Sequence, residues 1–133
     1  MKEIELQIST PARHALVDVT AEAQRLCSEN GWREGVLFLY IPHTTCGITI
    51  NENADPDVKT DMIDFLRKLV PYNPNFLHSE GNSDSHILAS LTGFSQTVFV
   101  TDGKLSLGLW QAIYLAEYDG PRRRKIWAKF QAD

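Results

Sequence analysis

One apolar segment constrains the fold of this chain more than any other feature. Residues 35–41 are almost all aliphatic or aromatic, and Pro42 follows them directly. A short β-prone run that ends at a residue unable to donate to a strand ladder is typical of a strand buried on both faces of a sheet. The run is far shorter than the roughly 20 residues that a helix needs to cross a bilayer. The sequence therefore predicts a folded β core and no membrane-spanning segment.

Other extended segments surround this strand. Residues 3–8 alternate between polar and apolar side chains, which predicts a strand with one buried and one solvated face. Residues 48–50 resume an extended pattern beyond a bend that contains His43. We expect three further strands, at 95–101, 104–118 and 122–130, joined by Asp-Gly and Asp-Gly-Pro turns.

Two helices have clear start and stop signals. Asp18 or Thr20 can cap a short helix that ends at Gly31, because glycine readily adopts the left-handed conformation that closes a helix. Asp55, followed by proline, predicts the cap and first position of a longer helix whose apolar face continues to Leu69. The second helix is the more strongly specified of the two.

A third, short helix is predicted over residues 83–92. Asn82 or Ser83 supplies its cap, and Gly93 ends it. The stretch before it, 71–82, is rich in proline and asparagine and predicts a long irregular loop of the kind usually kept for function.

Strands interleaved with a few helices predict an α+β fold, a compact sandwich in which helices pack on a mixed or antiparallel β-sheet core. With 133 residues, 43% of them hydrophobic, the chain is expected to form a single domain over residues 1–133. Its net charge of −4 argues against nucleic acid as a partner. Cys27 and Cys46 are predicted to be reduced thiols, and the charged N-terminal segment has no signal-peptide core, so we expect a cytoplasmic protein.

Three of the histidines lie in polar, loop-like surroundings: His43 in PHTTCG, and His78 and His86 in HSEGNSDSH. Neutral imidazole is a common metal ligand, and three histidines with an open position would let a divalent metal, zinc or magnesium, activate water or polarise an oxygen. The spacing matches no compact metal motif. The alternative is that His78 and His86 only form hydrogen bonds within a surface loop.

Groups suited to an anion lie close to these histidines in the sequence. Backbone amides at the helix start after Asn82, with the hydroxyls of Ser83, Thr44 and Thr45, can form a pocket for a phosphate or carboxylate. Arg122 follows an Asp-Gly-Pro turn and can reach the same ligand, since a fixed guanidinium suits phosphate. The alternatives are ordinary helix capping and a solvated edge charge.

Two carboxylates are candidate proton carriers, Glu80 in the loop and Glu117 near the end of a strand. Cys46 beside His43 also allows a cysteine nucleophile, although the sequence gives no residue to orient the base. Trp110 and Gln111 fit burial at a subunit interface.

Four motifs in order, PHTTCGITINENADPDV, HSEGNSDSH, GLWQ and EYDGPRRR, resemble the YjbQ-like family, also called the secondary thiamine-phosphate synthase family. The resemblance implies a compact α+β fold that forms a homotrimer, with His43, His78 and His86 grouped in a cleft near a subunit boundary. It also implies a weak thiamine-phosphate synthase activity. Leu109 stands where the family pattern usually has threonine, and Cys46 stands where it often has alanine or serine.

Three functions remain open at this point. The first is a metal-assisted enzyme acting on a small phosphorylated molecule, with His43, His78 and His86 as ligands. The second is a non-catalytic trimeric module that binds a metal or a phosphorylated metabolite in the same cleft. The third treats the histidines as a polar seam that holds the oligomer together.

Overall fold

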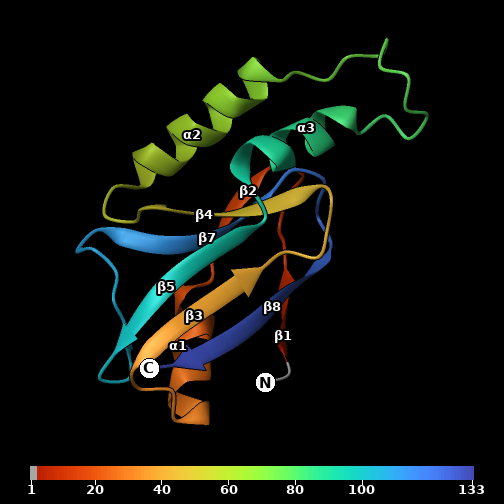
Figure 1. The fold of residues 1–133 in the computed structure, drawn as a ribbon. Coiled ribbons are helices and arrows are strands. Elements are labelled where there is room, and N and C mark those ends of the chain that lie inside the picture. The colour runs from red at the N-terminus through yellow and green to blue at the C-terminus, as the bar shows by residue number, and fades with distance from the viewer. Residues whose placement is uncertain (1–2) are drawn as a thin grey trace.

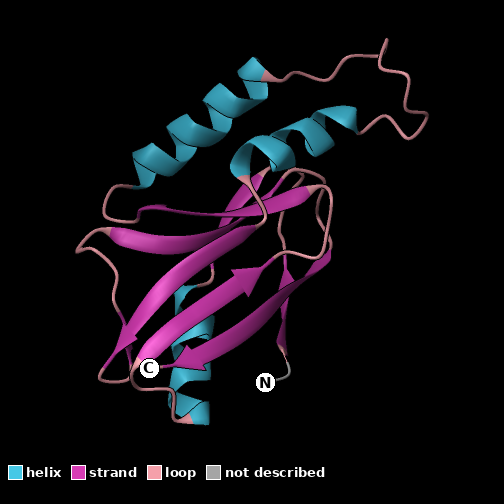
Figure 2. Cartoon of the chain, in the orientation of Figure 1, coloured by secondary structure: helices cyan, strands magenta, loops and turns pink. Residues whose placement is uncertain are grey.

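Two antiparallel sheets and three helices make up the fold in a computed structural model, which describes residues 3–133 (Figures 1 and 2). The predicted α+β class is confirmed. The elements are β1 (Ile4–Ser9), β2 (Ala15–Asp18), α1 (Thr20–Asn30), β3 (Gly35–Tyr40), β4 (Cys46–Glu52), α2 (Pro56–Leu69), α3 (Ser83–Thr92), β5 (Ser95–Thr101), β6 (Lys104–Leu105), β7 (Gln111–Glu117) and β8 (Arg123–Ala132).

The larger sheet has five strands in the order β1-β8-β3-β5-β6, and the smaller has three in the order β2-β7-β4. The predicted apolar strand, β3, lies at the centre of the larger sheet between β8 and β5. Register places Ile4 opposite Ala128 and Ser9 opposite Arg123. Ile4 and the end of β8 therefore lie at one end of this sheet, and the β7–β8 turn lies at the other (Figure 1).

The main core fills the space between the inner faces of the two sheets, with α1 packed against it. Period-two alternation turns Leu37 and Leu39 of β3 inward, where they meet Ile48 of β4 and Ile113 and Leu115 of β7, and all five are fully buried. Burial of each such side chain stabilises the fold by about 1.5–3 kcal/mol.

A second apolar cluster lies on the opposite face of the smaller sheet, beneath α2 and α3. The alternate residues of β7, Ala112, Tyr114 and Ala116, pack there with Leu88 of α3, and Leu66 of α2 closes the layer. In Figure 1 both helices lie together over this sheet, and the loop 71–82 joins them at one end.

Local signals explain where two helices start and stop. Asp55 Oδ1 accepts a hydrogen bond from the amide of Asp57 at 2.9 Å, so the predicted start of α2 is confirmed. Gly31 closes α1 at φ 65°, as predicted. The predicted cap was wrong: Val19, not Asp18 or Thr20, occupies the N-cap position without a side-chain capping bond, and Asp18 Oδ1 accepts from the amide of Thr20 just inside the helix. α3 differs from the prediction: Asn82 occupies the N-cap position, but its side chain forms no capping bond.

Three details of the sequence prediction were wrong. Strand β2 was not predicted, because its four residues are too few to display a period. The segment 106–110 interrupts the strand expected over 104–118, leaving β6 and β7 separate. β3 is buried on one face only, since Phe38 and Tyr40 are 42% and 50% exposed. No helix within residues 3–133 is long and apolar enough to cross a membrane.

Candidate functional site

A polar cleft of about 350 Å³ lies at the end of the sheets that carries the β3–β4 and β7–β8 turns. Residues far apart in the sequence meet here because β3 and β8 are hydrogen-bonded neighbours, and α3 packs beside β4. Three segments form its walls. They are the β3–β4 turn, the end of the 71–82 loop with the first turn of α3, and the β7–β8 turn. The lining residues are Pro42, His43, Thr44, Thr45, Glu80, Asn82, His86, Asp119, Arg122 and Arg124.

His43 is held by the neighbouring strand. Its Nε2 accepts a hydrogen bond from the backbone amide of Lys125 at 2.8 Å. Partial burial lowers the pKa of His43, and the nearby Arg124 guanidinium lowers it further. An imidazole that accepts at Nε2 carries its proton on Nδ1, so His43 presents a neutral ring with that nitrogen as a donor.

His86 and His78 lie beside each other. Their ring centroids are 5.6 Å apart, and the two planes are perpendicular. His86, on α3, lines the cleft, whereas His78, in the preceding loop, is exposed and lies outside the lining. Nε2 of His78 is 3.6 Å from a carboxylate oxygen of Glu80. The loop therefore places His78 against His86 and contributes Glu80 to the lining of the cleft.

The three predicted metal ligands do not converge on one point. His43 already uses Nε2 to accept the Lys125 amide, and Nε2 of His78 lies 3.6 Å from the Glu80 carboxylate. Within residues 3–133 there is no group of three or more His, Cys, Asp or Glu side chains placed to hold a metal ion. This donor set does not fit a three-histidine metal site in one chain, and zinc or magnesium binding stays a prediction.

A buried ion pair supports the floor of the cleft. Arg124 Nε donates to Glu117 Oε1 at 2.8 Å, and the same carboxylate accepts from Thr10 Oγ1 at 2.7 Å and from the Asp119 amide at 3.0 Å. Burial alone would raise the pKa of Glu117, but the hydrogen bonds from Arg124 and Thr10 outweigh it and lower the pKa. Arg124 also donates to Thr45 Oγ1 at 2.8 Å, which fixes the β3–β4 turn.

The β7–β8 turn presents the second arginine. Arg122 Nε donates to the Asp119 carbonyl at 2.8 Å, and its guanidinium lies 3.2 Å from the Asp119 carboxylate while remaining about half exposed. Gly120 is required here because a Cβ atom would lie 2.4 Å from the carbonyl oxygen of Ala12. The turn is thus pressed against the β1–β2 loop, with Arg122 at the mouth of the cleft.

Asn82 bridges the turn and the helix. Its Nδ2 donates to Asp119 Oδ2 at 2.9 Å, which explains why the side chain does not cap α3. Its Oδ1 is buried and accepts no hydrogen bond from any residue between 3 and 133. A buried acceptor without a partner is costly, so this oxygen is suited to a donor on a bound molecule.

Most of the predicted site residues meet in the cleft: His43, Thr44, Thr45, Glu80, Asn82, His86 and Arg122. Three predicted residues lie outside its lining. His78 contacts the ring of His86, and Ser83 is the first residue of α3. Glu117 is fully buried and paired with Arg124. Cys46 is also fully buried, and burial raises its pKa to about 12, so its thiol stays protonated at neutral pH.

Sequence reasoning did not single out Asp119 or Arg124. The signal for Arg124 was the alternation of faces along the strand, which turns Arg123 and Lys125 to solvent and Arg124 inward. A charge on the inner face needs a partner, and Glu117, at the end of β7 in the smaller sheet, supplies it.

Proteins of the same family match almost the whole chain. The family model described as UPF0047 protein YjbQ-like matches residues 4–133. UPF0047 protein MJ1081 of Methanocaldococcus jannaschii is 54% identical over 127 residues, which are 96% of this chain and 92% of that protein. UPF0047 protein YugU of Bacillus subtilis is 46% identical, over 93% of this chain and 95% of its own.

Solved structures agree with this match. An uncharacterized conserved protein of the yjbq/upf0047 family from Clostridium acetobutylicum has a TM-score of 0.92 at 45% identity, over 96% of this chain and 99% of its own. A hypothetical protein from Aeropyrum pernix has a TM-score of 0.92 at 32% identity, over the whole of both chains. With the family model, the relatives and the fold in agreement, this chain belongs to the UPF0047 YjbQ-like family.

Proposed function

We propose that the chain is a small-molecule enzyme that binds a phosphorylated substrate in the cleft, a transferase with the thiamine-phosphate synthase activity that the family resemblance implies. The observation that carries the proposal is the convergence of two imidazoles, His43 and His86, with the half-exposed guanidinium of Arg122 around one cavity. Arginine at the mouth of a cleft binds phosphate oxygens through paired hydrogen bonds.

The proposed reaction joins a pyrimidine methyl pyrophosphate to a thiazole phosphate. A C–N bond forms at the methyl carbon as its bond to the pyrophosphate oxygen breaks, and pyrophosphate leaves with the electron pair. Arg122 is placed to stabilise the developing charge, and His86 is placed to donate a proton to the departing oxygen. The orphan Oδ1 of Asn82 accepts from a donor group on the substrate. No step uses a metal.

The test combines turnover with a binding readout. Purified protein is supplied with both substrates, formation of thiamine phosphate is measured, and the His86 ring signals are followed by NMR during titration with inorganic pyrophosphate. We expect product from the wild type and a loss of at least about tenfold in pyrophosphate affinity for Arg122→Gln. Arg123→Gln, at the exposed neighbouring position, is the matched control. Absence of both product and a His86 response would overturn the proposal.

One observation favours the alternative, a non-catalytic module that binds a phosphorylated metabolite. Glu117, one of the two candidate proton carriers, is fully buried and has its oxygens engaged by Arg124, Thr10 and backbone amides. Stoichiometric pyrophosphate binding at the cleft, without product from the two substrates, would establish the module in place of the enzyme.

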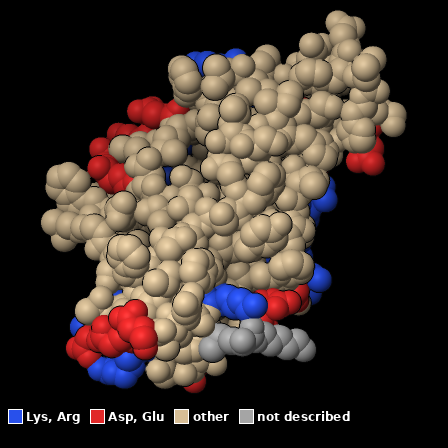
Figure 3. Space-filling model, in the orientation of Figure 1, with Lys and Arg blue, Asp and Glu red and all other residues tan. Residues whose placement is uncertain are grey.

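We also propose that the chain forms a homotrimer, as the resemblance implies. Four large side chains on the outer face of the five-stranded sheet, Phe38, Tyr40, Phe99 and Trp127, are 37–65% exposed, and Tyr40 stacks on Trp127. The centre of the view in Figure 3 carries few charges. Exposed apolar patches of this kind mark association surfaces. Light scattering should give three chains for the wild type and one for Trp127→Arg, with Phe65→Arg on α2 as control.

A further inference from the structure

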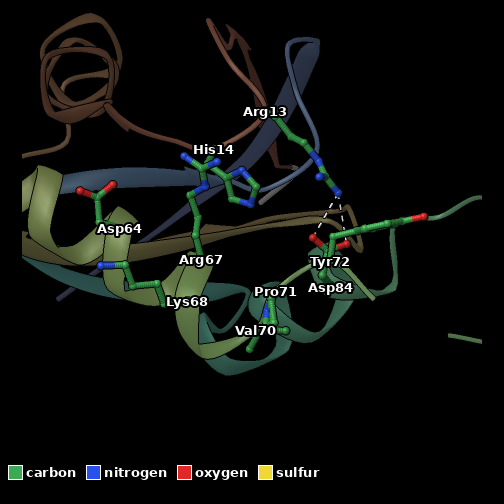
Figure 4. A pocket seen from close by; sticks show the side chains of 9 residues that line it. All are labelled: Arg13, His14, Asp64, Arg67, Lys68, Val70, Pro71, Tyr72 and Asp84. Atoms are coloured by element: carbon green, nitrogen blue, oxygen red, sulfur yellow. Dashed lines mark hydrogen bonds and ion pairs between the residues drawn. The ribbon is translucent and has the colours of Figure 1, made fainter. Parts of the chain in front are cut away.

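A second cavity, of about 510 Å³, lies beside the first turn of α3. Asp84 lines this cavity, whereas Asn82 and His86 of the same segment line the polar cleft that contains His43 and His86, the histidine cleft. The other walls are the β1–β2 loop, the last turns of α2 and the segment that follows α2 (Figure 4). The two cavities share the 71–82 loop and the first turn of α3, but no lining residue.

The cavity has an excess of cationic groups. Arg13 donates through Nη2 to both carboxylate oxygens of Asp84 at 3.1 Å, and Asp84 is 2% exposed, so this pair is mutually neutralised. Arg67 and Lys68 of α2 line the same cavity, and neither forms an ion pair with any residue between 3 and 133. Asp64, one turn before Lys68, offsets part of that charge. Arg67 therefore leaves an unbalanced guanidinium facing the cavity.

The pKa of His14 is affected by the positive charges in this cavity. Burial lowers its pKa, and Arg13 and Arg67 lower it further, while Asp84 and Glu117 act in the opposite direction more weakly. Figure 4 shows the Arg67 guanidinium beside the His14 ring. The His14 ring also lies near the ring of Tyr118 in an edge-to-face arrangement, with ring centroids 6.2 Å apart. The imidazole is thus enclosed by cations and an aromatic ring.

Beyond these charges the cavity wall is apolar. Val70 and Pro71 form it, and the ring of Tyr72, which is 56% exposed, extends along its rim (Figure 4). A charged end next to a flat apolar end is suited to a ligand with the same two parts, and the volume lies within the usual range of about 300–1,000 Å³ for small-molecule pockets.

We infer that this cavity is a second binding site, which takes the phosphate group of a small molecule against Arg67, Lys68 and His14 and places an aromatic ring of that molecule against Tyr72. The inference does not rest on the proposed function, because the two cavities share no lining residue. An anion between Arg67 and His14 makes charge-assisted hydrogen bonds and balances the excess charge. Stacking on Tyr72 then adds selectivity for phosphate compounds that carry an aromatic ring.

The experiment uses two probes, inorganic phosphate and phenyl phosphate, titrated into the full-length protein while the His14 ring signals are followed by NMR. We expect saturable shifts, tighter binding of phenyl phosphate, and a rise in the His14 pKa on binding, since the anion offsets Arg13 and Arg67. The double variant Arg67→Gln and Lys68→Gln should weaken both probes by about tenfold or more. Tyr72→Ala should remove only the advantage of phenyl phosphate.

Two controls separate this site from the histidine cleft and from general loss of charge. Arg25→Gln with Lys129→Gln removes the same two charges from exposed positions elsewhere and should leave binding unchanged. Arg122→Gln, in the cleft, should also leave the His14 response unchanged. Equal affinity in the Arg67 and Lys68 double variant and the wild type, or a His14 response that disappears with Arg122→Gln, would overturn the inference.

Discussion

Arg124 and Glu117 form an ion pair that is closed to solvent: Arg124 Nε lies 2.8 Å from Glu117 Oε1, and the two side chains are 2% and 0% exposed. The pair joins β7 to β8 beneath the histidine cleft, and Arg124 reaches from it to Thr45. Charges buried this deeply are tolerated only when each has its partners.

Removing one member of the pair should therefore be costly. We expect Arg124→Met to lower the free energy of unfolding by about 3–5 kcal/mol, because it leaves the Glu117 carboxylate buried without its counter-charge. Urea denaturation measures this. Arg123→Met, at the adjacent exposed position, should change stability by less than about 0.5 kcal/mol. If Arg124→Met with Glu117→Gln were as unstable as Arg124→Met alone, the uncompensated charge would not be the cause.

The same ion pair makes the free energy of unfolding depend on pH. The folded pKa of Glu117 lies below its ordinary value of 4.5, so the unfolded chain binds the proton more readily. Its contribution is fully present above pH 4.5 and is lost as pH falls through the folded pKa. Urea midpoints measured from pH 7 downward should fall more steeply for the wild type than for Glu117→Gln, and parallel curves would contradict this assignment.

His43 should titrate below its ordinary value of 6.5, because burial and Arg124 both disfavour the charged ring. Protonation at Nε2 also ends the hydrogen bond from the Lys125 amide. The unfolded chain therefore takes up this proton first, and stability contributed by neutral His43 is lost as pH falls below 6.5. NMR titration of the ring measures the pKa. A value above 6.5 would mean that the Glu117 carboxylate, which acts in the opposite direction, outweighs burial and Arg124.

Metal content tests the three-histidine hypothesis directly. Since His43 Nε2 is engaged and no three such side chains converge within residues 3–133, we expect untagged, dialysed protein to hold well below one zinc or magnesium per chain by elemental analysis. A near-stoichiometric metal that disappears in the folded triple variant His43→Ala, His78→Ala and His86→Ala would establish the metal site instead.

The fold was predictable where local chemistry decides structure. Asp55 with its following proline marks the start of α2, Gly31 the end of α1, and the apolar run of β3 the centre of the larger sheet. The exposure of Phe38 and Tyr40 was not predictable, because an apolar side chain that faces solvent or a partner has the same sequence pattern as one in a core.

The candidate site was predictable as a set of residues but not as a geometry. Polar loop motifs pointed to His43, Asn82 and His86, which do share a cleft. Sequence spacing could not predict that the Lys125 amide donates to His43 Nε2. Nor could it predict that Asn82 donates to Asp119 instead of capping α3. Those contacts depend on strand register and on the β7–β8 turn, both of which are tertiary.

The position of the C-terminal end of β8 has a practical consequence. Register puts Ile4 and the end of β8 at one end of the larger sheet, whereas Arg123, beside the histidine cleft, pairs with Ser9 at the other. Because β8 runs the length of that sheet, a fluorophore or an immobilising linker attached at Asp133 is held away from both cavities. Surface-based binding assays can therefore be built on this chain without obstructing the sites they are meant to measure.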